Sequence, residues 1–587
     1  NPQKDKYVYC LRQLKAHKAT KAKTMEDVKA IELIGKLTER FTRTCPPAPE
    51  YQQRLAEEFE IILDLRFVDY FLQIRDILDI TQDIPHMTRG SAGSSLVCYL
   101  MGITDVDPVQ WDIPVARFLN PKRDDLPDVD IDYPHYRQEE VMNRIFKKWP
   151  GKSARISNYV LYQDKSARRE AAKRLGYRGR LPRKFTYESL GIDPEEAKRI
   201  ENKLKGKKKC ISKHCGGILM FTRQLPKSLI SQSNQILLDK NEVEDLEHLK
   251  VDVLANRGLS QLLEVDPTTK LYEYPEIDEA TSSLLSRGDV LGVTQGESPA
   301  MRRLFRAIRP QSMLDCVFAT ALIRPVAMEG RRKAAFFNDW TSDRISDVVV
   351  CEDDAIMQIS KLIGCSTYEA DMYRRAFAKK NEEQVMQFMT KLGDHPRKDE
   401  IFRSLQALSG FGLCRAHAVN LGRLIWALAY QKAHNLKGFW KGALKHCKGS
   451  YKRWVYKTEA KRAGLEPTTI SKTDRWDDPV YQYKKYGWWS NKSFLPGFYT
   501  KHLYLDRVEF CGLIANGRVY KAGNKKYVTF VTLGVDNGYY VDITINRPFS
   551  YTDNDVVRGI GRIKHLNNSD YIEAIECESI SIDKFYN

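Results

Sequence analysis

The stretch Pro127–Tyr133, which reads PDVDIDY, constrains the fold more than any other part of the chain. Three aspartates alternate with apolar β-branched residues, and alternate side chains of a β-strand share one face. Val129 and Ile131 are therefore expected to face a core. The opposite face would carry the three aspartates, Asp128, Asp130 and Asp132. Carboxylates so close together repel one another, and a divalent metal such as Mg²⁺ neutralises them well. The pattern predicts a strand that holds metal ions.

A calcium-binding loop is the competing interpretation of the same stretch. The three aspartates would occupy positions 1, 3 and 5 of such a loop, with Glu139 at position 12. Position 6 needs a glycine for its sharp turn, whereas Tyr133 stands there. The strand interpretation is therefore favoured.

A second acidic strand is expected at 249–254, which reads LKVDVL. Lys250 and Asp252 would share one face, while Val251 and Val253 would share the other. A two-metal centre needs about three carboxylates around ions roughly 3.5–4 Å apart. Asp252 is the candidate for the third carboxylate.

Small residues at 89–95, RGSAGSS, precede the helical run LVCYLMG. They would open that helix and expose backbone N–H groups at its positive end, where anions bind. An ordinary helix cap, with small residues for packing, is the alternative. A Gly-Ser phosphate loop upstream of a D-x-D strand is the layout of beta-type nucleotidyltransferases, so we expect the catalytic palm of such an enzyme.

The chain has 587 residues and a net charge of +18. Its length implies several domains. Lysines and arginines cluster at 165–184, 203–209, 302–309 and 437–462, and aromatic residues are interleaved with several of these clusters. A solvated basic surface is one interpretation, but this clustering favours nucleic acid as the partner. No apolar run reaches the roughly 18 residues of a membrane-spanning helix, so no membrane partner is expected.

The 12 cysteines show no spacing typical of a disulfide framework, which indicates a reducing cytoplasm. Cys210, His214 and Cys215 lie close together in the sequence. A structural zinc site usually takes four ligands as two spaced pairs, and we find no second pair. We therefore expect no structural zinc.

Longer motifs resemble the C-family bacterial replicative polymerases, the family of the DNA polymerase III alpha subunit. The run from Thr88 to Tyr133 resembles that family's phosphate loop, its RFLNPER element and its PDxDIDF motif without a gap. Further resemblances join KHCGGIL to HAAGVV, LKVDVLANRGL to LKFDFLGLRTL, EADMYRRAFAKK to EADxxRRAMGKK, and GFGLCRAHAVNL to GYGFxxSHAxxY. The motifs come in the family's order from about residue 50 to 460.

The resemblance implies an α+β multidomain fold with a beta-type nucleotidyltransferase palm, a helical thumb and fingers, and a C-terminal all-β OB-fold domain. Short strands from Val508 to about Ile580, with tyrosines expected to be exposed at 520, 527, 539 and 540, favour the OB-fold over a generic β domain. The expected divisions are an N-terminal helical extension at 1–50, the palm at 51–155 and 210–275, the thumb at 156–209, the fingers at 276–455, a reduced linker or remnant of a clamp-binding region at 456–505, and the OB-fold at 506–587.

The resemblance also implies the site residues. Asp128, Asp130 and Asp252 match catalytic carboxylates that hold two Mg²⁺ ions, with Mn²⁺ as a substitute, and Asp132 is their neighbour. The expected nucleotide- and phosphate-binding residues are Arg89, Gly90, Ser91, Arg117, Arg123, Lys250, Arg374, Arg375, Lys379, Lys380 and His417, the last with a structural role as an equal alternative. The expected DNA-binding residues, on basic helices and a basic run, are Lys165, Arg168, Arg169, Lys173, Arg174, Lys207, Lys208 and Lys209.

The implied function is template-directed addition of dNMPs to a primer 3′-hydroxyl, with primer-template DNA and dNTPs as partners, in the cytoplasm of a bacterium or a phage-infected cell. Two alternatives stay open: a template-independent nucleotidyltransferase, and a non-catalytic DNA-binding replication subunit. The sequence before Arg89 has no room for the family's PHP domain, and we find no exonuclease constellation, so we expect a compact form without proofreading. A sliding-clamp motif is matched only loosely at Gln311–Leu314, and clamp binding stays open.

Overall fold

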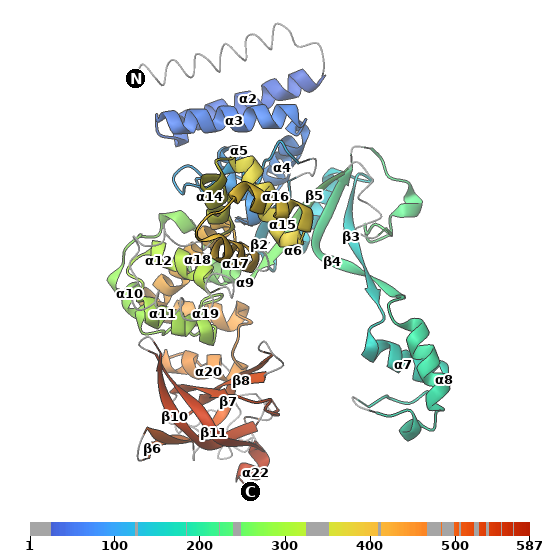
Figure 1. Cartoon of the computed structure of the whole chain (residues 1–587), viewed down its shortest axis with the longest axis vertical. Helices are drawn as coiled ribbons and strands as arrows, with labels where there is room; N and C mark the ends of the chain where they lie inside the picture. Colours follow the sequence, from blue (N-terminus) through green and yellow to red (C-terminus); the bar gives the residue numbers. More distant parts are fainter. Residues whose placement is uncertain are drawn as a thin grey trace.

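The chain folds around two β-sheets with helices packed between and beside them (Figure 1). The structure is a computed structural model. It describes residues 25–123, 127–182, 185–221, 223–238, 248–323, 351–408, 412–466, 483, 498–503, 506–521, 527–535, 539–552, 555–566 and 569–586. None of the helices within these ranges is long and apolar enough to cross a membrane.

The central sheet has five strands in the order β1-β2-β5-β4-β3. Its strands are β1 (Met87–Arg89), β2 (Val129–Pro134), β3 (Ser153–Leu161), β4 (Lys208–Phe221) and β5 (His248–Asn256). Strands β2 and β5 are parallel neighbours, and the remaining pairs are antiparallel. The two acidic strands predicted from alternation therefore lie side by side although more than a hundred residues separate them.

One face of β2 packs into a helical core, as its alternation predicts. Val129, Ile131 and Tyr133 are almost completely buried. They belong to a core cluster that also takes residues from the N-terminal helices and from α6. These helices are α2 (Met25–Thr44), α3 (Pro49–Asp64), α4 (Val68–Ile80), α5 (Leu96–Leu100) and α6 (Gln138–Lys148).

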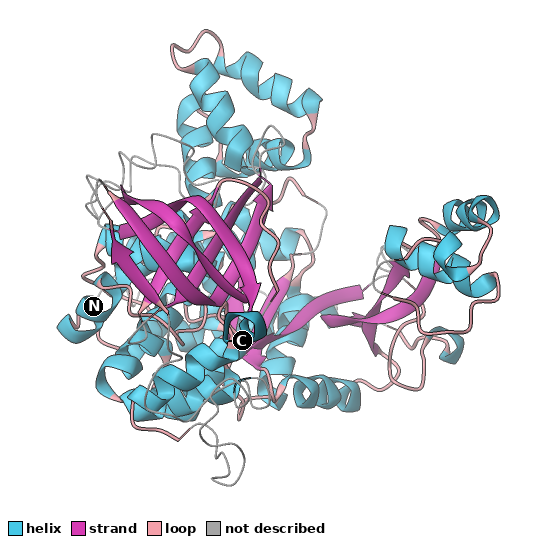
Figure 2. Cartoon of the chain, turned by 90° about the horizontal axis from the view of Figure 1, so that it is seen from below, coloured by secondary structure: helices cyan, strands magenta, loops and turns pink. Residues whose placement is uncertain are grey.

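Strands β3 and β4 extend beyond the sheet as a long arm that carries two helices, α7 (Asp164–Arg174) and α8 (Pro194–Leu204) (Figures 1 and 2). The inner half of β4 is buried, whereas its outer half is mostly exposed. The helices at the end of the arm have a small core of their own, with Ala171, Tyr187 and Ala197 among its buried residues. The arm lies within the segment predicted as a thumb.

A helical lobe follows β5. Its largest core cluster is built around α18 (Arg415–His434), which is buried on most sides. Around it lie α9 (Arg257–Val265), α10 (Glu279–Ser286), α11 (Pro299–Ile308), α12 (Met313–Leu322), α19 (Leu436–His446) and α20 (Arg453–Arg462). A smaller cluster with its own core consists of α14 (Glu352–Ile363), α15 (Thr367–Lys379), α16 (Glu382–Leu392) and α17 (Lys398–Leu408). Short 3₁₀ turns are η1 (Gly90–Ser94), η2 (Val115–Arg117), η3 (Glu188–Leu190), η4 (Lys227–Leu229) and η5 (Leu271–Glu273).

The C-terminal residues form a β-barrel, which confirms the prediction of a C-terminal β domain. Its elements are β6 (Tyr499–His502), β7 (Arg507–Lys521), β8 (Tyr527–Gly534), β9 (Tyr540–Ile545), β10 (Asp555–Leu566), β11 (Ser569–Ser581) and α22 (Ile582–Tyr586). The ring closes in the order β7-β8-β9-β11-β10, because β10 pairs with both β11 and β7. Strands β9 and β11 are parallel. The sequences Ala-Gly-Asn at 522–524 and Asp-Asn-Gly at 536–538 are typical of turns between such strands, and they lie outside the described residues.

One expected barrel tyrosine is not free on the surface. Tyr520, Tyr527 and Tyr539 are exposed, as predicted. Tyr540 instead packs against Trp454 of α20, and its hydroxyl donates to Glu459 at 3.0 Å. The prediction was wrong there because alternation within one strand does not reveal which strand face meets another domain.

Candidate active site

The register of the central sheet brings two aspartates together. Asp130 on β2 is paired with Asp252 on the parallel strand β5, so their side chains lie on the same face. Gly217 of β4 is paired with Asp252 on the other side. Its missing side chain matters, because a Cβ there would lie 3.0 Å from Asp252 Oδ1. The carboxylate pair predicted from two separate strands is thus formed by the fold.

Asp130 and Asp252 place two like charges side by side, and a bound cation would offset their repulsion. Burial, and then the charge of Asp252, raise the pKa of Asp130 to about 7. Lys250 Nζ lies 3.1 Å from Asp128 Oδ1 and 3.2 Å from Asp252 Oδ2, so it partly neutralises both. Asp252 Oδ1 is buried and has no hydrogen-bond partner within the described chain. An acceptor of this kind, beside a second carboxylate, suits a hard divalent cation.

Asp128, the third predicted carboxylate, lies close to the pair but does not point at a common metal position with it. The Asp128 side chain is 64% exposed and faces Lys250. Within the described ranges, no three His, Cys, Asp or Glu side chains are arranged to hold a metal ion. The fit to a divalent metal therefore rests on the Asp130–Asp252 pair, with Asp128 close by.

Asp132 has a different role from its two neighbours. Its side chain is only 1% exposed, and Arg89 donates to it through Nε and Nη2, each at 2.9 Å. Asn256 Nδ2 also donates to it at 2.9 Å. This arrangement supports the expectation that Asp132 is a neighbour and not a ligand. It also places the Arg89 guanidinium against Asp132, and Arg89 does not line the cavity described below.

The Gly-Ser loop lies directly beside the carboxylate pair. Gly90 has a φ of +72°, and a Cβ there would lie 3.1 Å from Asp130 Oδ2. Glycine is needed for both the left-handed backbone and the close approach. The next residue, Ser91, lines a cavity of about 240 Å³. The other predicted residues that line it are Arg117, Arg123, Asp128, Arg374, Arg375 and Lys379.

The helix after this loop does not offer its N-terminus to an anion, which corrects one prediction. The N–H groups of Leu96 and Val97 donate to the buried carboxylate of Glu58, at 2.8 and 3.0 Å. The hydroxyl of Ser95 donates to the same carboxylate at 2.6 Å. An internal carboxylate thus already occupies the positive end of α5. Arginine and lysine side chains instead surround the cavity beside the loop.

Two carboxylates that sequence reasoning missed hold those arginines in place. Glu352 Oε2 lies 2.7 Å from Arg117 Nη2 and 3.1 Å from Arg374 Nη1. Asp371, which is completely buried, accepts from Arg374 Nε at 2.9 Å and from Arg123 Nη1 at 3.2 Å. Burial is the largest single influence and lowers the pKa of Arg117, but the charge of Glu352 and of further acidic groups, Asp353 and Asp371 among them, together raise it. The available signal was two short acidic runs, 352–354 and 369–371, upstream of the basic residues at 374–380.

His214 is a further residue to which the sequence alone assigned no role in the site. Its Nδ1 accepts from the backbone N–H groups of Gly216 and Gly217, at 3.2 and 2.6 Å, and lies 4.0 Å from Asp252 Oδ1. These bonds assign the proton of a neutral imidazole to Nε2. The imidazole thus borders the carboxylate pair instead of joining Cys210 and Cys215, whose thiols are exposed.

Comparison with known proteins identifies the family. Residues 31–255 match the bacterial DNA polymerase III alpha NTPase domain, and residues 257–399 match the finger domain of the same subunit. The chain belongs to the DNA polymerase III alpha family. Similar proteins are the DNA polymerase III alpha subunits of Halalkalibacterium halodurans (29% identity, covering 67% of this chain and 40% of the relative) and Bacillus subtilis (29%, 73% and 44%). An error-prone DNA polymerase of Dechloromonas aromatica is also similar (29%, 73% and 48%), and the chain spans less than half the length of each relative.

In this DNA polymerase III alpha family member, two further predicted nucleotide residues, Lys380 and His417, do not line the cavity. Lys380 follows α15 with a φ of +56°. His417 lies in the first turn of α18, close to the Gly-Ser loop: Cys414 Sγ donates to the carbonyl of Gly90 at 2.9 Å. A Cβ at Gly93 would lie 2.6 Å from Ala416 Cβ, so this helix supports the loop from behind.

The predicted DNA-binding residues lie on the arm, away from the carboxylates. Most are exposed: Lys165, Arg168, Lys173, Arg174, Lys207, Lys208 and Lys209. Two of the arginines also hold the arm together. Arg168 lies over the rings of Phe185 and Tyr187, and Arg169 donates to backbone carbonyls at 181 and 182. The basic outer surface of the arm is thus separate from the cavity lined by Ser91 (Figure 1).

Proposed function

We propose that this chain is a template-directed DNA polymerase that adds dNMPs to a primer 3′-hydroxyl. The observation that carries the proposal is the register-matched pair Asp130–Asp252, next to a cavity lined by arginine and lysine side chains. This combination is what a triphosphate and its counter-ions require.

The proposed roles follow from the positions of the side chains. Asp130, Asp252 and the nearby Asp128 would hold Mg²⁺, which supplies charge neutralisation and a lower pKa for the primer hydroxyl. Ser91 and the guanidiniums beside it bind the triphosphate and offset the charge that develops on the departing pyrophosphate. Glu352 and Asp371 hold those guanidiniums in position before the nucleotide arrives, which lowers the entropic cost of binding.

We assign the central sheet to the palm, the arm to the thumb, and the helices that carry Glu352 and Asp371 to the fingers. The exposed basic residues of the arm suit duplex backbone, which a polymerase must hold without reading its sequence. The pairing order of the barrel and its exposed tyrosines support the OB-fold assignment and a contact with single-stranded template.

Primer extension on four templates tests the proposal. Each template specifies a different first nucleotide, and each is supplied with all four dNTPs or all four NTPs. We expect the added nucleotide to follow the template and dNTPs to be preferred. Addition that ignores the template would favour a template-independent nucleotidyltransferase, and DNA binding without any addition would favour a non-catalytic subunit. The Asp130→Ala variant is the control for a contaminating polymerase.

A further inference from the structure

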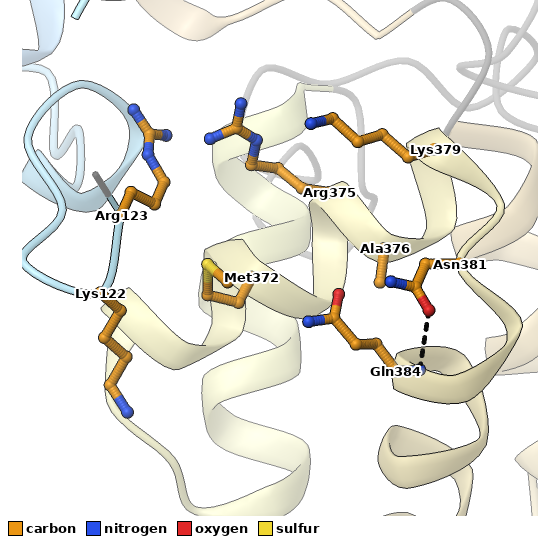
Figure 3. Close-up of a pocket in the computed structure, with 8 residues that line it drawn as sticks. All are labelled: Lys122, Arg123, Met372, Arg375, Ala376, Lys379, Asn381 and Gln384. Carbon is orange, nitrogen blue, oxygen red and sulfur yellow. Dashed lines mark hydrogen bonds between the residues drawn. The ribbon is translucent and has the colours of Figure 1, made fainter. Parts of the chain in front are cut away.

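A second cavity adjoins the cavity beside Asp128, and Figure 3 shows the residues that line it. Its volume is about 430 Å³. Its lining residues are Lys122, Arg123, Met372, Arg375, Ala376, Lys379, Asn381 and Gln384. Three of these, Arg123, Arg375 and Lys379, also line the cavity beside Asp128. The two cavities therefore meet at a shared group of cations.

The chemistry of this second cavity favours a small, multiply charged anion. Four of its lining side chains are cationic and none is a carboxylate. Among the described residues, Lys122 pairs with Glu369 at 3.9 Å, a long distance for an ion pair, so Glu369 only partly neutralises the lysine. Arg123, by contrast, is held by Asp371. Converging cations attract phosphate groups when no carboxylate is among the side chains that line the cavity.

Besides the four cations, two side-chain amides line the cavity and can donate hydrogen bonds, those of Asn381 and Gln384. Asn381 is the N-cap of α16, and its side-chain oxygen accepts from the backbone N–H of Gln384 at 3.2 Å. The Gln384 side chain extends toward the space between Met372 and Ala376, on the side that faces Arg375 (Figure 3). The cavity thus has cations on its palm side and along α15, and amides at the start of an eleven-residue helix.

We propose that this cavity receives the pyrophosphate released by nucleotide addition, an inference that rests on the proposed polymerase function. The primer 3′-oxygen forms a bond to the α-phosphorus and loses its proton to solvent, while the bond from that phosphorus to the oxygen that bridges to the β-phosphate breaks. Its electron pair stays on the pyrophosphate, which must then leave the carboxylate site. The shared cations Arg123, Arg375 and Lys379 contact both cavities, so the anion stays neutralised as it moves. Five residues line only the second cavity: Lys122, Met372, Ala376, Asn381 and Gln384. Of these, Lys122 and Gln384 are the two chosen for substitution.

The test uses two substitutions in the full chain, Lys122→Gln and Gln384→Glu. We measure the inhibition constant of inorganic pyrophosphate in primer extension and the KM for dNTP. We expect the inhibition constant to rise about three- to fivefold in each variant, with a smaller change in the KM for dNTP, since one partly exposed charge is altered. Lys361→Gln, at an exposed lysine of α14 that lines neither cavity, is the matched control and should change neither quantity.

A direct titration separates this inference from the proposed function. Pyrophosphate is titrated by calorimetry into the Asp130→Ala chain, with and without each substitution. If the wild-type chain fails to extend a primer, the proposed function fails, and the titration alone decides whether the cavity binds pyrophosphate. Unchanged pyrophosphate binding and inhibition in both variants overturns the inference. The inference is also overturned if the substitutions selectively weaken the binding of a second dNTP molecule or of a 5′ template overhang. The cavity would then hold a nucleotide or DNA.

Discussion

At the scale of single residues, Asp130 and Asp132 differ sharply although they share a strand face. Asp130 lies against another carboxylate, whereas Asp132 is matched by Arg89 and Asn256. We predict that Asp130→Asn lowers extension by at least about a thousandfold and leaves the melting temperature unchanged or higher. Asp132→Asn should instead destabilise the fold by about 2–3 kcal/mol, because it breaks a buried ion pair. Melting curves and extension rates of both variants check this, and near-normal synthesis by Asp130→Asn would refute the metal assignment.

A second prediction concerns the glycine that separates His214 from Asp252. A Cβ at Gly217 would lie 2.7 Å from His214 Nδ1 and 3.0 Å from Asp252 Oδ1. Gly217→Ala should therefore displace one of the two and lower kcat about ten- to a hundredfold, because small misplacements at a reacting centre are costly. The double variant His214→Ala/Gly217→Ala removes one side of the clash. If Gly217→Ala retains the wild-type kcat, the close packing is not needed for activity.

Alternation in the sequence was enough to predict the residue pattern of β2 and β5, because one face of each strand is apolar. It could not predict which long-range partner each polar group finds. Glu58, which fills the positive end of α5, lies far upstream of that helix. The same holds for Glu352, which reaches Arg117 across the fold. Local patterns report burial, whereas these contacts depend on tertiary packing.

At the scale of secondary-structure elements, the junction of β2, α9 and α19 should be sensitive to acid. His135, just after β2, hydrogen-bonds Ser260 of α9 through Nδ1 at 2.8 Å, and its ring contacts His446 of α19. Burial, and then the charges of Arg257, His446 and Lys448, lower the pKa of His135 to about 4. Glu264 is the acidic group on this junction, and it pairs with His446.

The direction of the resulting pH effect follows from that lowered pKa. The unfolded chain takes up the proton near pH 6.5, whereas the folded chain resists it until about pH 4. Acidification across this window therefore favours unfolding. We predict that the melting temperature of the wild type falls more between pH 7 and pH 4.5 than that of His135→Gln. Parallel curves for the two proteins would show that this histidine does not contribute.

At the scale of the whole molecule, the arm and the nucleotide cavity should act separately. Lys165, Lys173 and Arg174 are exposed on α7, and replacing all three with glutamine leaves the arm's internal contacts made by Arg168 and Arg169 intact. We predict that primer-template binding weakens and that its slope against log salt falls by about two to three, roughly one per lost phosphate contact. The KM for dNTP on saturating DNA is the internal control. An unchanged salt slope would remove the arm from the DNA-binding surface.

The role of the barrel is better tested by point substitutions than by truncation, because the barrel shares a core with the helical lobe. Tyr540 packs on Trp454, Lys452 N donates to Ala515 O at 2.8 Å, and barrel residues belong to the same core cluster as α18. Removing the barrel would expose this apolar surface and confuse loss of binding with loss of folding. Tyr520→Ser with Tyr539→Ser removes two exposed rings, of which that of Tyr520 also contacts Phe530 and Arg518 within the barrel.

We predict that this double variant weakens binding of a single-stranded template overhang by about 2–4 kcal/mol if both rings stack on bases. Single-nucleotide addition on a template without an overhang beyond the templating base should change much less. Tyr272→Ser, at an exposed tyrosine of the helical lobe, is the matched control. If the barrel variant and this control lose affinity equally, the barrel tyrosines do not contact the template. Because Tyr540 stays in place, the contact between barrel and lobe is preserved, and any loss belongs to the exposed surface of the barrel itself.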